Sequence, residues 1–268
     1  MFVGLNELLG VSVERPEEGK LTLLCATKTD ADFLTHHFLS FYLKAGCKVC
    51  FVALVQSFSH YSIVAQKLGI SLPAAKERGQ LVFLEGLKSS CDVLFSEEDQ
   101  SAGPNPFQFI SSGDGSNLKV LYEFVWTALS PAAGGDSWKC PVLIVDNLSV
   151  LLSLGLRLVD VLDFLHYCRG TVISQLKGNI VVMVHSSDDS EDEENELLAA
   201  ALRHQSHRIL WAEGLATGFC RDIHGQLTIT QRSLWEKRAE RDLEHIFQYK
   251  IQDKNVTFFA RGMSAAVL

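Results

Sequence analysis

The chain has 268 residues, of which 47% are hydrophobic and 21% charged, and its mean hydropathy is slightly positive. This length suits one large α/β domain or two small ones. Because no run of about 18 uninterrupted apolar residues occurs, we expect neither a transmembrane helix nor a membrane partner. The amino terminus lacks the basic start of a secretory signal. Seven cysteines at irregular spacings indicate reduced thiols, and hence a cytoplasmic or nuclear location.

Most of the formal net charge of −8 is concentrated in one segment. Ser187–Glu194 contains six carboxylates, and without them the net charge becomes −2. The remainder of the chain is therefore nearly neutral and lacks the strongly basic face of a self-sufficient nucleic-acid-binding protein. We predict that Ser187–Glu194 is a solvated acidic loop in which Ser190 is a candidate for an acid-directed kinase.

Strand and helix patterns alternate along most of the chain, which is typical of a parallel sheet covered by helices on both faces. Buried strands are predicted at Lys20–Cys25, Lys48–Leu54, Gln80–Leu87, from Cys140 onward, and at Asn179–Val184. Helices are predicted at Asp30–Ala45, His60–Leu68, Leu118–Leu129, Leu158–Val172 with Gly178 at its end, and Asn195–Arg203. The segment 89–117 is rich in Ser, Gly, Asp and Pro, and we predict an irregular insertion there.

The carboxyl-terminal part changes character, because short strands joined by turns replace the strand–helix alternation. These strands are predicted at Arg208–Ala212, Gln226–Thr230, His245–Ile251 and Val256–Ala260. Such a series predicts an antiparallel extension on the parallel core. The sequence shows no internal repeat, and we favour a single domain over residues 1–268.

The turn after the first strand is where nucleotide-binding α/β folds carry a phosphate loop. That loop reads G-x-x-x-x-G-K-[ST], and its backbone N–H groups cradle the phosphates. Here a Lys-Thr pair is kept, but Thr22 and Thr27 stand where the two glycines belong, and no glycine occurs between Gly19 and Gly46. Two carboxylates at the helix start complement the helix dipole and would repel a triphosphate. The degenerate phosphate-loop positions are Thr27, Lys28, Thr29, Asp30 and Asp32.

A second element of ATPases is an aspartate that ends a hydrophobic strand and positions Mg²⁺. Asp146 in VLIVDNLS has this form. Its alternative role is that of a polar residue ending a buried strand, which we favour because the phosphate cradle is missing. The second strand ends in Val55-Gln56-Ser57 and lacks the carboxylate that would activate water. We therefore expect no catalytic residue, no metal and no cofactor.

Cysteines and histidines invite a metal or redox interpretation at Cys47-x-x-Cys50 and at His36-His37. Residues three apart in a strand point to opposite faces, and adjacent residues on a helix diverge. A structural zinc site also needs a second ligand pair, which the sequence does not offer at suitable spacing. We interpret the two cysteines as core residues.

Two modest basic clusters are candidates for contact with RNA. One of them includes a tryptophan, which would allow stacking on a base together with contacts to the backbone. We favour a solvated amphipathic surface over this interpretation. The candidate RNA-contact residues are Arg203, Arg208, Arg232, Trp235, Lys237 and Arg238.

Several long stretches carry a resemblance that is more specific than any of these short motifs. They are KLTLLCATKTDADFLTHHFLSFYLKAGCKVCFVALVQSFSHYSIV, QLVFLEGLKS, PVLIVDNLSVLLSLG, EGLATGFCRDIHGQL and YKIQDKNVTFFARGMS. These stretches closely resemble the family of sixth subunits of the Elongator complex. The resemblance runs nearly end to end and is interrupted mainly at 89–117 and at Leu234–Glu244.

This resemblance implies a RecA-like fold without functional Walker motifs. It also implies a non-catalytic place beside subunits four and five in a hetero-hexameric ring, with two copies of each subunit. That ring belongs, together with a catalytic subcomplex, to the assembly that modifies the wobble uridine of tRNA. The ring is associated with tRNA binding and nucleotide-dependent release. Two alternatives stay open: a residual ATPase that uses Lys28, Thr29 and Asp146, and a stand-alone RNA-binding module.

Overall fold

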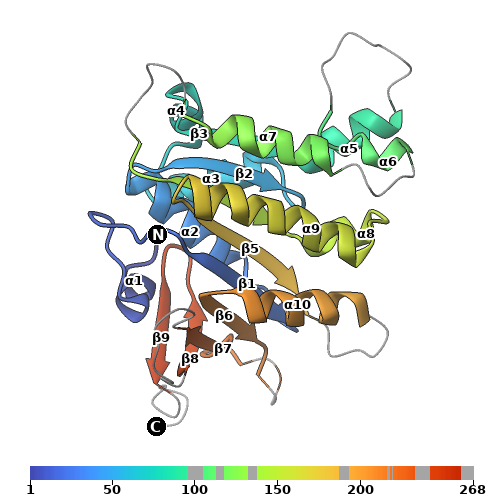
Figure 1. The fold of residues 1–268 in the computed structure, drawn as a ribbon. Coiled ribbons are helices and arrows are strands. Elements are labelled where there is room, and N and C mark those ends of the chain that lie inside the picture. Colours follow the sequence, from blue (N-terminus) through green and yellow to red (C-terminus); the bar gives the residue numbers. More distant parts are fainter. Residues whose placement is uncertain are drawn as a thin grey trace.

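A nine-stranded sheet runs through the part of the chain that the structure, a computed structural model, describes. The described residues are 1–95, 105–112, 118–131, 138–186, 193–215, 218, 220–232 and 242–260. The strands are β1 (Leu21–Thr27), β2 (Lys48–Ala53), β3 (Leu81–Glu85), β4 (Pro141–Asp146), β5 (Asn179–His185), β6 (Arg208–Glu213), β7 (Gly225–Gln231), β8 (Leu243–Ile251) and β9 (Val256–Ala260). Their order across the sheet is β3-β2-β4-β5-β1-β6-β7-β8-β9 (Figure 1).

Helices cover both faces of this sheet, as the alternating pattern predicts. One face carries α1 (Val3–Leu9), α2 (Asp32–Lys44), α3 (Phe58–Lys67) and α4 (Leu72–Glu77). The other face carries α5 (Gly86–Phe95), α6 (Phe109–Ser112), α7 (Lys119–Leu129), α8 (Ser149–Ser153), α9 (Leu158–Cys168), which continues as a π-helix over Arg169–Gln175, and α10 (Glu193–Gln205).

Strand β1 lies at the centre and is buried along its whole length. It pairs in parallel with β5 on one side and with β6 on the other. Because successive side chains of a strand point to opposite faces, Leu21 and Leu23 enter the core beneath α9 and α10, whereas Leu24 enters the core beneath α2. Burial on both faces explains why the strand is a continuous apolar run rather than an alternating one.

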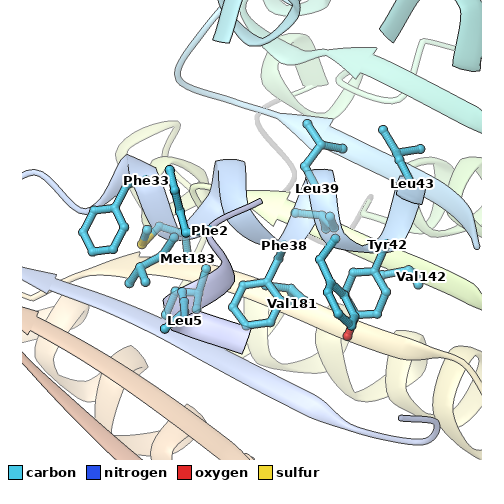
Figure 2. Packing of buried hydrophobic residues seen from close by; sticks show 14 of the residues in the cluster. Phe2, Leu5, Phe33, Phe38, Leu39, Tyr42, Leu43, Val142, Val181 and Met183 are labelled. Carbon is cyan, nitrogen blue, oxygen red and sulfur yellow. The ribbon is translucent and has the colours of Figure 1, made fainter. Parts of the chain in front are cut away.

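Helix α2 is buried on nearly all sides. Phe38 and Tyr42 point toward Val181 and Val142 of the sheet, whereas Leu39 points away from the sheet (Figure 2). Contacts with α3 cover part of the outer side. Phe33–Leu43 are all buried, including the polar residues Thr35, His36, His37 and Ser40, so α2 needs cover beyond the sheet alone.

The amino-terminal segment supplies part of that cover. The backbone N–H of Phe2 donates to Nδ1 of His37 at 3.1 Å, and the two rings stack with centroids 6.0 Å apart. Burial lowers the pKa of His37 to about 3, which keeps this ring nitrogen a neutral acceptor. Helix α1 then lies against β9, so the first ten residues close one face of the carboxyl-terminal strands.

The direction of β6 corrects one expectation. The strand predicted at Arg208–Ala212 belongs to the parallel core and not to the antiparallel extension, which begins at β7. The physical reason is that helix α10 forms the crossover between β5 and β6, and a helical crossover returns the chain in the same direction. Strand β8 is paired on both sides, by β7 and by β9.

The prediction of an irregular insertion at 89–117 is wrong for the residues of that segment that the structure describes, because helices occur there. Helix α5 begins at Gly86, directly after Glu85, so Leu87 belongs to a helix and not to β3. Further along, Phe107 and Phe109 are buried with ring centroids 5.8 Å apart, and α6 begins there. The abundance of small polar residues concealed these few apolar residues, which pack against the sheet.

The predicted acidic loop, Ser187–Glu194, overlaps a helix at its carboxyl end. Glu193 and Glu194 form the first turn of α10, where carboxylates interact favourably with the positive end of the helix dipole. Residues 187–192 of the predicted loop lie outside the described residues. Helix α4 was not expected from the sequence at all, because its single turn and a half offers too little periodicity.

Gly178 has a different role from the helix end that the sequence predicts. The left-handed residue is Lys177, with φ of 55°, and it follows the π-helix. A Cβ atom on Gly178 would lie 2.2 Å from the carbonyl oxygen of Pro141. Glycine is therefore needed here because β4 passes close to the backbone.

Gly178→Ala should lower the free energy of unfolding by about 1–3 kcal/mol, because backbone atoms must move apart to admit the methyl group. Gly170→Ala is the matched control, since no atom lies within 4 Å of a Cβ built there. The control should raise the free energy of unfolding by up to about 1 kcal/mol, through the higher helix propensity of alanine. Urea denaturation of both variants measures the difference, and equal stabilities would contradict the close approach.

Candidate functional site

The candidate site lies at the carboxyl end of β1, where the degenerate phosphate loop connects this strand to α2. Thr27 is the last residue of β1 and Asp32 is the first of α2. Lys28 adopts a left-handed conformation with φ of 53°. The N–H of Gly214 donates to the carbonyl oxygen of Thr27 at 3.0 Å, and a Cβ atom on Gly214 would lie 2.6 Å from the carbonyl oxygen of Lys28. The segment after β6 therefore packs directly on this turn.

The two threonines of the turn are hydrogen-bonded to aromatic side chains of other strands. Thr29 Oγ1 lies 3.0 Å from the hydroxyl of Tyr249, a fully buried residue of β8. Thr27 Oγ1 accepts from the indole N–H of Trp211, on β6, at 3.1 Å. In a functional phosphate loop the hydroxyl after the lysine binds Mg²⁺. Here the corresponding hydroxyl, that of Thr29, is bonded to a tyrosine.

The start of α2 is capped by the chain itself. Asp30 Oδ1 accepts the backbone N–H of Asp32 at 2.8 Å. The free N–H groups of a helix start are what makes it an anion-binding site. In this protein one of these N–H groups is already bonded to a carboxylate of the same turn. A phosphate oxygen would have to displace that carboxylate to bind there.

Asp32 occupies an electrostatically unfavourable position. Burial, together with the negative charges of Asp30 and Asp146, raises the pKa of Asp32 to about 7. The structure thus brings the predicted phosphate-loop aspartates and the aspartate of β4 within electrostatic reach of one another. Three neighbouring carboxylates repel an anionic ligand such as a triphosphate.

Asp146 ends β4, as predicted, and only 4% of its surface is exposed. The hydroxyl of Tyr61, on α3, donates to Asp146 Oδ2 at 2.6 Å. Burial raises the pKa of Asp146, and the hydrogen bond from Tyr61 opposes that rise. Among the described residues, no group of three or more His, Cys, Asp or Glu side chains could hold a metal ion. The geometry fits the role of a satisfied polar residue at a strand end.

A pocket of about 250 Å³ opens beside these carboxylates, between α2, α3 and the turn after β8. Asp30, Asp32, His36, His60 and Lys67 contribute to its walls. Burial and the neighbouring His60 lower the pKa of His36 to about 4, so its ring is neutral near pH 7. Pockets that hold drug-sized ligands measure about 300–1,000 Å³. This pocket is therefore small for a nucleoside triphosphate.

The candidate RNA-contact arginines are engaged within the chain. Arg208 is buried and pairs with Glu17 at 2.6 Å, and Arg232 pairs with Asp242 at 3.0 Å. The guanidinium of Arg203 lies over the ring of Trp211, 4.6 Å from its centroid. Trp235, Lys237 and Arg238 lie outside the described residues.

Only two of these arginines come together. Arg203 and Arg232 line a shared cavity of about 400 Å³ with Trp211, Asp242 and Glu244. Arg208 precedes Ile209 and Trp211 on β6 and points to the opposite face of the sheet, toward α2. The cavity thus has carboxylates beside its arginines, which weakens its attraction for a phosphate backbone.

Three aromatic residues that complete this region, Tyr61, Trp211 and Tyr249, carry no signal in the sequence. Each is separated by many residues from the partner it contacts, and the local sequence around each shows only an apolar helix or strand. No motif could have identified them.

A family model described as Elongation complex protein 6 matches residues 2–253 of the chain. The chain belongs to the Elongation complex protein 6 family. It is 63% identical to Elongator complex protein 6 of Homo sapiens, with 100% of both chains covered. The same coverage holds for the proteins of that name from Xenopus laevis, at 59% identity, and Danio rerio, at 48%.

Solved structures resemble this member of the Elongation complex protein 6 family in fold. An uncharacterized protein of Pyrococcus horikoshii, PH0321, matches with a TM-score of 0.57 at 11% identity and covers 97% of this chain and 98% of its own. The KaiC-like protein PH0186 of the same organism matches with a TM-score of 0.50 at 12% identity, covering 91% of each chain. At such identities the likeness concerns the fold alone. The expected α/β fold of RecA-like type, with a mostly parallel sheet and antiparallel carboxyl-terminal strands, is confirmed.

Among the described helices of this family member, none is long and apolar enough to cross a membrane.

The raised pKa of Asp32 makes stability depend on pH in a direction that can be tested. Between about pH 4 and about pH 7 the folded state binds the proton that the unfolded state has lost, so stability falls as the pH rises through this window. Asp32→Asn removes the carboxylate, and with it the free-energy cost of burying a negative charge above about pH 7. The free energy of unfolding of Asp32→Asn, relative to that of the wild type, should therefore increase by about 1–2 kcal/mol from about pH 5 to about pH 8, after allowance for partial exposure.

Denaturation of both proteins at the two pH values measures this change. Asp163→Asn is the control, because Asp163 is exposed on α9. The control should alter the free energy of unfolding by no more than about 0.5 kcal/mol at either pH. An advantage of Asp32→Asn that does not change with pH would contradict the buried-charge interpretation.

Proposed function

We propose that this chain is a non-catalytic structural subunit of the Elongator complex, acting in the cytoplasm, with the nucleus as a second location to be tested. The observation that carries the proposal is the full-length similarity to proteins named Elongator complex protein 6. The name of those relatives assigns them to the Elongator complex. The match over the full length of both chains supports a place for this chain in the same complex.

Within that complex, we propose a hetero-hexameric ring that this chain forms with subunits four and five, two copies of each. A member of such a ring needs two separate contact surfaces. Several large apolar side chains are exposed on elements that lie on different faces of the sheet: Ile63 on α3, Trp126 on α7, and Val159 and Tyr167 on α9. Strand β9 adds an edge without a further partner among the described strands. Exposed apolar surface and free strand edges are liabilities for an isolated chain and are typical of interfaces.

The proposed ring supports the modification of the wobble uridine of tRNA, and the catalytic Elongator subcomplex carries out the chemistry. We propose that tRNA contacts a surface composed by several subunits. The near-neutral body of this chain and the internal ion pairs of Arg208 and Arg232 support this view. Affinity for nucleic acid arises mainly from positive charge, whereas this chain has a formal net charge of −8.

The site supports the proposed lack of catalysis. Its loop lacks the glycines of a phosphate cradle, its helix start is bonded to Asp30, and the hydroxyl of Thr29 is bonded to Tyr249. A residual ATPase would have to displace both hydrogen bonds and place a triphosphate beside three carboxylates. We propose that nucleotide chemistry in the ring belongs to other subunits.

Calorimetry should show no low-micromolar binding of Mg-ATP to the isolated chain, because the loop lacks the glycines of a phosphate cradle and Asp30, Asp32 and Asp146 lie beside it. Lys28→Ala is the matched variant, and it should leave any ATPase activity of the assembled ring unchanged. Tight binding to the wild type that Lys28→Ala abolishes would restore the ATPase alternative.

Light scattering should show that the chain forms a larger assembly when subunits four and five are added, with a mass that fits two copies of each. In an electrophoretic assay at moderate salt, tRNA should bind to this assembly and not to the chain alone. A well-behaved monomer that ignores both partners would contradict the ring. Salt-sensitive tRNA binding by the chain alone would favour the stand-alone RNA-binding module.

A further inference from the structure

Two cysteines that are distant in the sequence meet at the amino-terminal end of the sheet. Cys47 directly precedes β2 and Cys140 directly precedes β4, and 93 positions separate them. Their Sγ atoms lie 3.2 Å apart. The pair lies at the end of the sheet opposite to the degenerate phosphate loop, because β1, β2 and β4 run in parallel and that loop follows the end of β1.

The pair is distinct from the Cys47-x-x-Cys50 motif. Cys47 and Cys140 belong to the core beneath α2, whereas Cys50 belongs to the core on the other face of the sheet. Both members of the pair are buried, with 0% and 3% of their surfaces exposed. The motif that the sequence suggests is therefore not the pair that the fold creates.

The backbone geometry suits a disulfide. The N–H of Lys48 donates to the carbonyl oxygen of Cys140 at 3.0 Å, so the two cysteines stand on neighbouring strands of the same ladder. Neighbouring strands lie about 4.8 Å apart, which falls within the Cα–Cα range of disulfides. A disulfide needs a sulfur–sulfur distance of about 2.05 Å. The two Sγ atoms must therefore approach each other by about 1 Å, which rotation of the cysteine side chains can provide.

The surroundings of the pair favour reaction at Cys47. The hydrogen bond from the Cys140 thiol lowers the pKa of Cys47, and Lys139 contributes in the same direction. The side-chain amide of Asn179 donates to Cys140 Sγ at 3.7 Å and so fixes the second sulfur beside the first. Redox-sensor cysteines combine a lowered pKa and an adjacent resolving thiol with access for the oxidant. The Cys47–Cys140 pair has the first two features, and because both residues are buried, peroxide reaches the pair only when this end of the sheet opens locally.

We propose that Cys47 and Cys140 form a reversible disulfide when the protein meets hydrogen peroxide. The Cys47 thiolate attacks one peroxide oxygen, the O–O bond breaks, and the released hydroxide takes up a proton to leave as water. Cys47 is then a sulfenic acid. The Cys140 sulfur attacks the Cys47 sulfur, the S–O bond breaks, and the Cys140 proton leaves with that hydroxyl as a second water. Two thiols are oxidised, one peroxide is reduced, and a thiol reductant reverses the change.

The disulfide would link the residues that directly precede two neighbouring strands, and it would close a long loop of chain. Such a link reduces the conformational freedom of the unfolded chain while demanding little movement in the folded one. The oxidised protein should therefore be more resistant to unfolding, with the candidate site at the other end of the sheet unaffected. The proposal concerns the fold of this chain and does not depend on its proposed place in Elongator.

Peptide mapping of the full chain tests the proposal. The reduced, folded protein is first treated with N-ethylmaleimide to block accessible thiols such as Cys91, which is exposed, and is then treated with hydrogen peroxide. Trypsin cleaves after Lys44 and Lys48, so Cys47 and Cys50 fall in separate peptides. Mass spectrometry without reductant should show peptide 45–48 linked to peptide 140–157, and the link should disappear after reduction.

The melting temperature provides an independent measurement. Oxidation of the wild type should raise it by about 5 °C or more, and reduction should restore the original value. Cys47→Ala should abolish both the linked peptide and the shift, whereas Cys91→Ala should keep both. If Cys47→Ala does not fold, Cys140→Ala replaces it, and the peptide map of the wild type needs no variant. Absence of the 45–48 to 140–157 link, or its formation only in denaturant, would overturn the proposal.

Discussion

Burial of strand β1 and of nearly all of helix α2 is the constraint from which the rest of the structure follows. A strand that is apolar on both faces must lie inside a sheet, and β1 is accordingly paired with β5 and β6. A helix whose residues are buried from Phe33 to Leu43 must be covered on its outer side as well. The amino-terminal segment and α3 provide part of that cover, and the bond from Phe2 to the neutral ring of His37 fixes the segment in place.

The turn between β1 and α2 is bonded to the rest of the fold through its threonines. Lys28 and Asp30 are exposed, whereas the hydroxyls of Thr27 and Thr29 are bonded to Trp211 and Tyr249 of distant strands. The carboxylate of Asp30 takes up an N–H at the helix start. In a phosphate-binding relative of such a fold, a ligand satisfies those groups. Here side chains satisfy them, so the turn is stable without a ligand.

The sequence predicted a large part of this architecture from periodicity alone. The strands at 20–25, 48–54 and 179–184 and the helices around them are present, because long apolar runs and amphipathic spacing are strong local signals. The predictions failed where local composition conflicted with packing. Phe107 and Phe109 are buried within a segment that reads as irregular, and β6 is parallel because of the crossover helix α10 and not because of its own residues.

The sequence by itself determined the fold class, the family and the lack of a glycine-rich phosphate loop, because each of these depends on residue types in a fixed local order. The tertiary structure alone decided which side chains meet: Tyr61 with Asp146, Tyr249 with Thr29, and Cys47 with Cys140 rather than Cys50. These contacts join residues tens to hundreds of positions apart. Only the order of strands across the sheet brings them together, and that order leaves no mark in the local pattern of any one segment.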